Sequence, residues 1–389
     1  MINSENIPLS LYIHIPWCEK KCPYCDFNSH DNQQHFDESA YIKALLIDLD
    51  QDLNLFNDCK KRSINSIFIG GGTPSLFSAD AYKLLISEIS LRLNITDAEI
   101  TIEANPSSSE QQKFIAYRDS GINRLSIGTQ SYNEKLLLKI GRVHNKTDAL
   151  SAAESARKAG FDNFNIDIMF ALPEQSLEQS LYDIEQAISF APTHLSCYQL
   201  TLEPNTLFYK HPPKLPDSDL AWEMQKNMQT TLSAAGYEQY EVSAYAQPNK
   251  RCQHNLNYWE FGDYLAIGAG AHGKITTPIG EIHRYWKQKQ PKKYLNTAHT
   301  ENRIGALERI SQQEILFEFM LNALRLKHGF DQSLLTQRTG IDPKIFKHIF
   351  DKHKKNGLMQ INEKSDALFF KPTEKGYIFI DSMLNDYLH

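Results

Sequence analysis

Short apolar or alternating runs recur along the first half of the chain, and longer segments with helical periodicity follow them. Two of the helical segments end at Gly121 and Gly160, where the C-cap of a helix is expected. A regular alternation of strands and helices predicts parallel β/α units. The six predicted strands are LYIHI (11–15), SIFIG (66–70), EITIEA (99–104), RLSIG (124–128), FNIDIM (164–169) and HLSCYQL (194–200).

Six such units predict an α/β fold, a partial TIM-like (β/α)6 barrel over residues 1–215. Barrels of this kind bind their ligands at the C-terminal ends of the strands. Polar or glycine-rich segments follow several predicted strands at that end: GGGTPS, EANPS, GTQS and DIMFALP. We therefore expect these segments to meet at one mouth of the barrel.

The pattern changes in the Pro-rich stretch around 203–220. For 216–300 we predict a β/α extension with a helix from 221, a strand at 237–243 and a glycine-rich turn in GDYLAIGAGAHG (262–273). For 305–389 the order of three helices, a hairpin at 358–373 and a last helix resembles a winged helix-turn-helix, which predicts a winged-helix-like α+β domain.

Composition narrows the class of protein. Hydrophobic residues make up 41% of the chain and charged residues 23%, as in an ordinary globular protein. The net charge of -6 gives no general attraction to nucleic acid, and the lysines of 343–357 gather where they complement a helix dipole, so no nucleic-acid partner is expected. No apolar run approaches the 18 residues of a membrane helix and no signal peptide is evident, so we expect no transmembrane segment and a cytoplasmic location.

Three of the six cysteines, Cys18, Cys22 and Cys25, fall in WCEKKCPYCDF directly after the first predicted strand. A zinc site would need a fourth ligand, and neither His14 nor His30 has the usual paired spacing. An iron-sulfur cluster normally takes four cysteines, so a loop that offers three leaves one iron open to an outside ligand. The other cysteines, Cys59, Cys197 and Cys252, are interpreted as structural, with a soft-ligand role for Cys252 as an alternative.

This C-x-x-x-C-x-x-C spacing after the first strand of a partial barrel resembles the radical S-adenosylmethionine (SAM) family. The resemblance implies two cofactors, a 4Fe-4S cluster on Cys18, Cys22 and Cys25 and SAM, whose amino and carboxylate groups chelate the open iron. In that family an electron from the cluster breaks a carbon-sulfur bond of SAM and yields a deoxyadenosyl radical. The residues that match SAM-contacting positions of the family are Tyr12, Gly71, Gly72, Thr73, Glu103, Gln130, Arg142 and Asp167.

The motifs LYIHIPWCEKKCPYCDFNSH, GGGTPS, IEANP, RLSIGTQS, GRVH and NIDIMFALPEQS are similar to one subgroup of that family. It contains oxygen-independent coproporphyrinogen III dehydrogenase and a heme chaperone. Phe27 stands where the dehydrogenase carries a further cysteine, only ten residues precede Leu11, and HNLNYW (254–259) matches a motif associated with the chaperone. We therefore predict a heme chaperone that passes heme to an acceptor protein.

The alternative is the dehydrogenase itself, which converts propionate side chains to vinyl groups with loss of carbon dioxide; whether the chain is an enzyme stays open. Either activity implies an electron donor such as flavodoxin or ferredoxin. If the protein is a heme chaperone, His254 is the candidate ligand of the heme iron, and Tyr258 and Trp259 are the candidates to cover the porphyrin. A capped loop packed on a core is the alternative for this motif. His272 is interpreted as a core histidine, with a cavity-facing position as the alternative.

Overall fold

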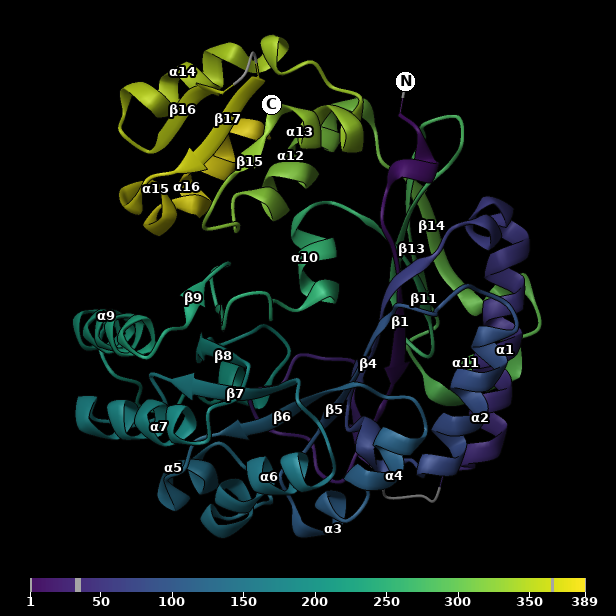
Figure 1. Cartoon of the computed structure of the whole chain (residues 1–389), viewed down its shortest axis with the longest axis vertical. Coiled ribbons are helices and arrows are strands. Elements are labelled where there is room, and N and C mark those ends of the chain that lie inside the picture. Colours follow the sequence, from purple (N-terminus) through teal and green to yellow (C-terminus); the bar gives the residue numbers. More distant parts are fainter. Residues whose placement is uncertain (1, 32–35, 365–366, 389) are drawn as a thin grey trace.

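The computed structural model describes residues 2–31, 36–364 and 367–388. A curved sheet of twelve strands forms its centre, in the order β14-β13-β12-β11-β1-β4-β5-β6-β7-β8-β10-β9 (Figure 1). All six predicted strands are present, and neighbours among them pair in parallel, which confirms the partial barrel. They are β1 (Leu9–Ile15), β4 (Ile64–Gly71), β5 (Glu99–Ala104), β6 (Arg124–Gln130), β7 (Phe164–Phe170) and β8 (His194–Gln199).

Residue alternation along these strands separates an apolar face from a polar one. On β1, Leu11 and Ile13 belong to the main hydrophobic core, whereas Tyr12 and His14, which alternate with them, point to the other face and share a hydrogen bond. The same alternation places Glu103 on β5 and Asp167 on β7 on the polar face, where both line the cavity inside the barrel. The interior is therefore lined with polar groups, while the apolar face is covered by helices.

The helices of the β/α units lie on the outside of the sheet (Figure 1). Positive φ angles of 103° at Gly121 and 83° at Gly160 place both glycines in the left-handed region right after helices, as the sequence predicts. The helices are α1 (Glu38–Leu55), α2 (Ala79–Ser90), α3 (Ser108–Gln111), α4 (Phe114–Asp119), α5 (Glu134–Lys139), α6 (Lys146–Lys158) and α7 (Leu177–Ser189).

Residues 238–309 extend the sheet at both edges, and here two expectations are wrong. The segment expected as one glycine-rich turn contains β11 (Asp263–Ile267), whose side chains are buried and which pairs in parallel with β1. Only 268–271 form the turn. The strand expected at 237–243 is replaced by the short β9 (Glu238–Gln239) and β10 (Ala244–Ala246). The other elements between β8 and the C-terminal helices are α8 (Leu207–Lys210), α9 (Ser218–Ala234), α10 (Gln253–Trp259), β12 (His272–Thr276), β13 (Ile282–Lys287), α11 (Pro291–Thr297) and β14 (Ile304–Arg309).

The C-terminal elements form a second hydrophobic core with a sheet of three strands in the order β15-β17-β16, which confirms the winged-helix-like α+β arrangement. The two residues that join its hairpin lie outside the described residues. Ile7 and Phe261, which precede β1 and β11, join this core, so the C-terminal part packs at the end of these strands away from the mouth. Its elements are α12 (Gln312–Ala323), β15 (Phe330–Asp331), α13 (Gln332–Thr339), α14 (Lys347–Lys355), β16 (Met359–Lys364), β17 (Ala367–Pro372), α15 (Glu374–Ile378) and α16 (Ile380–Leu384).

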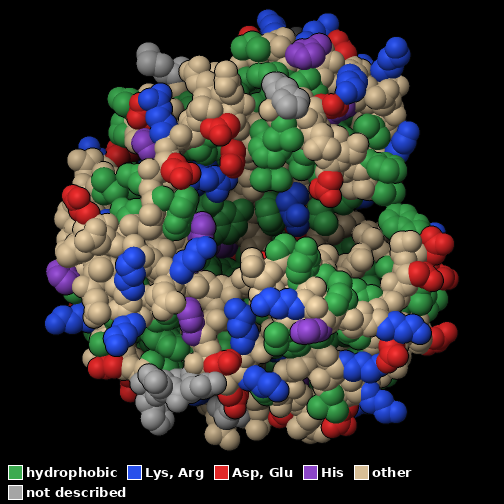
Figure 2. Space-filling model, turned by 180° about the vertical axis from the view of Figure 1, so that it is seen from behind, with side chains coloured by type: hydrophobic (Ala, Val, Ile, Leu, Met, Phe, Trp, Pro, Cys, Tyr) green, Lys and Arg blue, Asp and Glu red, His purple; other side chains and the backbone are tan. Residues whose placement is uncertain are grey.

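Seen from behind, the molecule is hollowed at its centre, and Lys and Arg side chains stand at the edge of the hollow (Figure 2). Within the described ranges, none of the helices combines the length and apolar character needed to cross a bilayer.

Candidate functional site

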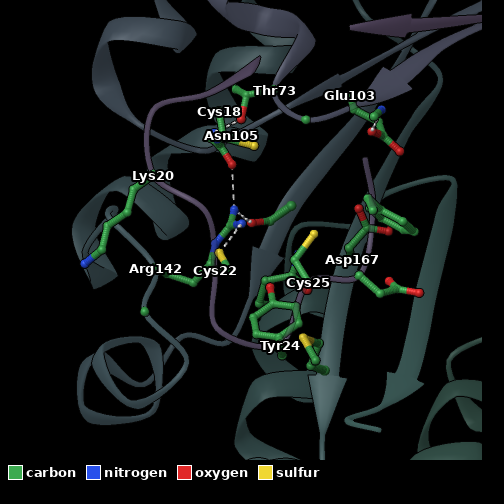
Figure 3. Close-up of a pocket in the computed structure, with 18 of the residues that line it drawn as sticks. Cys18, Lys20, Cys22, Tyr24, Cys25, Thr73, Glu103, Asn105, Arg142 and Asp167 are labelled. Atoms are coloured by element: carbon green, nitrogen blue, oxygen red, sulfur yellow. Dashed lines mark hydrogen bonds between the residues drawn. The ribbon is translucent and has the colours of Figure 1, made fainter. Parts of the chain in front are cut away.

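A cavity of about 340 Å³ lies at the C-terminal ends of the central strands, at the mouth that the sequence predicts. It brings together residues from the loop after β1 and from the ends of β4, β5, β6 and β7. Ten of the predicted site residues line it: Cys18, Cys22, Cys25, Gly71, Gly72, Thr73, Glu103, Gln130, Arg142 and Asp167. In Figure 3, Glu103 and Asp167 lie on one side of this cavity and Cys18, Asn105 and Arg142 on the other.

The cysteine loop begins at the short strand β2 (Trp17–Cys18), which pairs in parallel with β3 (His30–Asp31). The backbone amide of Lys21 donates to a carboxylate oxygen of Asp31 at 2.6 Å, which closes the loop across its base. Burial raises the pKa of the Cys18 thiol to about 11 and also raises that of Cys25. The loop therefore presents three thiols to one cavity, and ligation of iron would remove their protons.

The donor set fits an iron-sulfur cluster better than a zinc ion. His14 has both ring nitrogens engaged, Nδ1 at 2.9 Å from the Tyr12 hydroxyl and Nε2 at 2.8 Å from the Asn28 carbonyl oxygen. Among the described residues, no group of three His, Cys, Asp or Glu side chains is arranged to hold a single metal ion. Three thiols that line one cavity suit a cluster of several irons that leaves one iron open.

Gly71 is required by the close approach of His14 on β1, and Gly72 by the close approach of the cysteine loop. A Cβ at Gly71, where φ is 120°, would meet the His14 ring at 2.7 Å, and one at Gly72 would meet the Trp17 carbonyl oxygen at 2.5 Å. The amides of Gly72 and Thr73 donate to the carbonyl oxygens of Ile15 and Trp17, each at 2.7 Å. The two glycines were expected to contact SAM; in the structure they also let the loop after β4 lie directly against the end of β1 and the cysteine loop.

Glu103 and Asp167 place two carboxyl groups on the cavity wall. Burial, together with the nearby charge of Asp167, raises the pKa of Glu103 to about 8, and burial also raises the pKa of Asp167. Glu103 accepts a hydrogen bond from the Gly71 amide at 3.1 Å, and Asp167 accepts one from the Asn165 side chain at 2.8 Å. The charge of Asp167 disfavours the ionisation of Glu103, so the two carboxyl groups form a site that a cation would stabilise.

Arg142 places a positive charge on the opposite wall. Its Nη2 donates to the Asn105 side-chain oxygen at 2.6 Å and to the Gly128 carbonyl oxygen at 2.7 Å, and Nη1 lies 3.8 Å from the Cys22 sulfur. The guanidinium is thus held rigidly beside the cysteine loop. A carboxylate bound next to the open iron of a cluster would meet this group.

Other residues of the cavity were not singled out from the sequence. Asn105 holds Arg142 and stands two residues beyond Glu103, so the motif IEANP carried the signal that could have found it. The Tyr198 hydroxyl donates to the Gln130 side-chain oxygen at 2.7 Å and so fixes a predicted residue. Tyr12 lies outside this cavity and lines a second one.

The second cavity measures about 640 Å³ and adjoins the first, because Cys25, Asp26 and Phe27 line both. Phe27 is 61% exposed there. His272 was expected in the core, but it is exposed and lines this cavity because β12 begins at the cavity edge. The cavity-facing alternative is therefore the correct one for this residue.

Of the three residues predicted to contact heme, Tyr258 lines the second cavity, whereas His254 and Trp259 line neither of these two cavities. His254 is 2% exposed, with Nδ1 at 2.9 Å from the Ser66 hydroxyl and Nε2 at 3.1 Å from the Tyr258 hydroxyl, so an iron could reach it only after Tyr258 moves. Trp259 packs against the C-terminal core under the guanidinium of Arg325, 4.3 Å from the ring centre. Cys252, Cys59 and Cys197 are buried, in agreement with the structural interpretation.

Comparisons with known proteins agree with this geometry. Residues 12–185 match the model of the Radical SAM superfamily, and residues 310–364 match the HemN C-terminal domain. The chain is 46% identical to the heme chaperone HemW of Haemophilus influenzae and 44% identical to that of Escherichia coli, with 98% of each chain covered in both cases. The structure of coproporphyrinogen III oxidase (HemN) from Escherichia coli is similar with a TM-score of 0.81 at 23% identity, over 98% of this chain and 90% of that one, which shows the shared fold.

A partial β/α barrel with three loop cysteines at its mouth defines a radical SAM protein. Within that superfamily, the near full-length identity shows that the chain belongs to the HemW family. Both assignments agree with the resemblance drawn from the sequence motifs.

Proposed function

We propose that the protein is a heme chaperone: it binds heme beside a 4Fe-4S cluster and SAM, and it passes heme to an acceptor protein in the cytoplasm. The proposal rests mainly on one observation: the cysteine loop forms a wall that the two cavities share. The same loop can therefore hold a cluster in the first cavity and contact a second, larger ligand in the other. A volume of about 640 Å³ lies within the range typical of sites for small molecules and cofactors. The close relatives named heme chaperone HemW support the choice of heme.

Each group of the first cavity has a role in this proposal. Cys18, Cys22 and Cys25 hold the cluster, which supplies electrons and one open iron when it is bound. Arg142 meets the carboxylate of SAM, and Glu103 and Asp167 meet its cationic or hydroxyl groups. Gly71, Gly72, Thr73 and Gln130 shape the remaining wall. Flavodoxin or ferredoxin is the proposed class of electron donor.

Heme binding and release test the proposal directly. We expect the anaerobically reconstituted protein to bind one equivalent of hemin with a saturating change in the Soret band. We expect heme-free myoglobin, used as a probe acceptor, to take up this heme when the two proteins are mixed. Binding that never saturates, or heme that cannot be transferred, would contradict the proposed function.

Substitution of Asp167 by Asn tests the SAM site. The change removes a negative charge at nearly constant size, so we expect SAM to bind about tenfold more weakly or worse, with iron and sulfide content unchanged. Calorimetric titration of the reconstituted protein measures the effect. Asp162→Asn is the matched control, because Asp162 is exposed just before the other end of β7. Equal losses in both variants would argue against a role for Asp167 in SAM binding.

A further inference from the structure

Arg142 in the first cavity is held by two neutral groups. Its Nη2 donates to the Asn105 side-chain oxygen at 2.6 Å (Figure 3) and to the Gly128 carbonyl oxygen at 2.7 Å. Neither acceptor is a carboxylate, so neither cancels the positive charge of the guanidinium. These partners therefore fix the orientation of the guanidinium, while its charge stays available to an anionic ligand in the cavity.

Asn105 directly follows β5, and its side-chain amide has one orientation that satisfies both ends. An arginine only donates hydrogen bonds, so the amide oxygen must face Arg142 and the amide nitrogen needs an acceptor elsewhere. Glu110 supplies one at 3.4 Å, and the Thr73 hydroxyl lies 3.5 Å from the same nitrogen. Glu110 also accepts from the Asn105 backbone amide at 2.5 Å. Glu110 therefore holds Asn105 in the orientation that Arg142 requires.

Glu110 also holds the neighbouring loop of the cavity. It lies on α3, buried behind Asn105 with only 4% of its surface exposed. The Ser75 hydroxyl donates to its carboxylate at 2.5 Å, and Ser75 belongs to the one-turn 3-10 helix η3 (Pro74–Leu76) in the loop after β4. A buried carboxyl group needs such donors to offset its loss of water. One carboxyl group thus connects the loop after β4 to the loop after β5.

The segment that joins α3 to α4 supports this connection from behind. The Lys113 ammonium donates to the Ser75 carbonyl oxygen at 2.8 Å, and the Tyr117 hydroxyl lies 2.9 Å from the same oxygen. Burial raises the pKa of Glu110, although the hydrogen bonds from Ser75 and Asn105 and the nearby charge of Lys113 oppose this shift. The two loops are therefore fixed before a ligand arrives, as a preorganised site requires.

We propose that Asn105 and Glu110 are positioning residues of the SAM site: Glu110 orients Asn105, and Asn105 orients Arg142 toward the carboxylate of SAM. The inference rests on the SAM binding that is part of the proposed function. The pairing of an arginine with a carboxylate depends on the direction of the guanidinium fork, so a guanidinium that is free to turn would bind SAM more weakly. A neutral asparagine gives this orientation without competing for the charge of Arg142.

Calorimetric titration of the reconstituted full-length protein with SAM tests the inference. We expect Asn105→Ala to bind SAM about tenfold more weakly, with iron and sulfide content unchanged. Glu110→Gln puts an amide nitrogen in place of one carboxylate oxygen, so it should weaken SAM binding about threefold or more. Asn54→Ala, on the exposed face of α1, is the matched control and should bind SAM like the wild type.

Two further measurements separate a role through Arg142 from a general structural role. Decarboxylated SAM lacks the carboxylate that Arg142 would meet, so Asn105→Ala and the wild type should bind it within about twofold of each other. In an Arg142→Lys background, Asn105→Ala should likewise change SAM affinity by less than about twofold, because residues that act through one another are not additive.

Three results would overturn the positioning role and leave the SAM site itself standing. They are unchanged SAM affinity in Asn105→Ala, equal losses for SAM and decarboxylated SAM, and a loss in the Arg142→Lys background as large as in the wild type. If the reconstituted wild-type protein does not bind SAM, the SAM site of the proposed function fails together with this inference.

Discussion

Simultaneous replacement of Cys18, Cys22 and Cys25 by alanine is expected to abolish iron and sulfide binding completely after anaerobic reconstitution. The three thiols are the cysteines that line the mouth cavity, and the remaining three are buried elsewhere. A cluster that loses all its protein ligands cannot be retained. Chemical analysis of iron and sulfide, with the visible absorbance of the cluster, measures the effect.

Cys59→Ala is the control for this experiment, because Cys59 is buried in the main core and should leave the cluster intact. The variant without the three cysteines should still fold, since Cys22 and Cys25 are only partly buried. Iron and sulfide retained by the triple variant, or stoichiometric zinc in the native protein, would contradict the cluster assignment.

Replacement of Glu103 by Gln is expected to stabilise the ligand-free protein at pH 8 while it weakens SAM binding. The pKa of Glu103 is raised from 4.5 to about 8, so between these values the folded protein holds a proton that the unfolded chain has released. Folding stability therefore falls by about 1.4 kcal/mol per pH unit as the pH rises through this window, with a total of about 5 kcal/mol as an upper bound. A Gln side chain does not ionise, so the variant does not lose folding stability as the pH rises through this window.

We expect a gain in unfolding free energy on the order of 1–3 kcal/mol at pH 8, seen as a rise in Tm of a few degrees. At pH 5 the two proteins should differ little, because Glu103 is protonated in the folded wild type. SAM should bind to the reconstituted variant at least about tenfold more weakly, since a carboxylate partner is lost. Equal stability at pH 8, or unchanged SAM affinity, would argue against a strained carboxyl group in the SAM site.

Much of the fold could be predicted because the strands of a buried parallel sheet carry a strong local signal. The run LYIHI and its five counterparts contain apolar residues on one face, and each became a strand with its end at the mouth. The strand DYLAI was missed because its glycine-rich neighbours suggested a turn; Leu265 and Ile267 are buried, which was the signal for a strand. The prediction of a strand at 237–243 was wrong because the residues before β10 turn to contact other parts of the chain. The Tyr240 hydroxyl, for example, lies 2.8 Å from Nε2 of His194.

The candidate site was predictable where chemistry and strand position agreed, as for Cys18, Glu103 and Arg142. Side-chain partners could not be predicted, because they depend on contacts between distant segments. His254 is bonded to Ser66 across 188 positions of the chain, and nothing in HNLNYW indicates that both its ring nitrogens are engaged. His272 was placed in the core because a glycine-rich context does not reveal which side of a strand faces a cavity.

We expect this protein to carry heme and not to oxidise a porphyrinogen. Two assays run in parallel on one preparation of the protein test this most directly. The reconstituted protein, with SAM and a reductant under anaerobic conditions, is given coproporphyrinogen III in one assay and hemin in the other. We predict saturable binding of one equivalent of hemin and no vinyl product. Vinyl product formed at rates ordinary for enzymes, on the order of one turnover per second, together with no saturable hemin binding, would contradict the account.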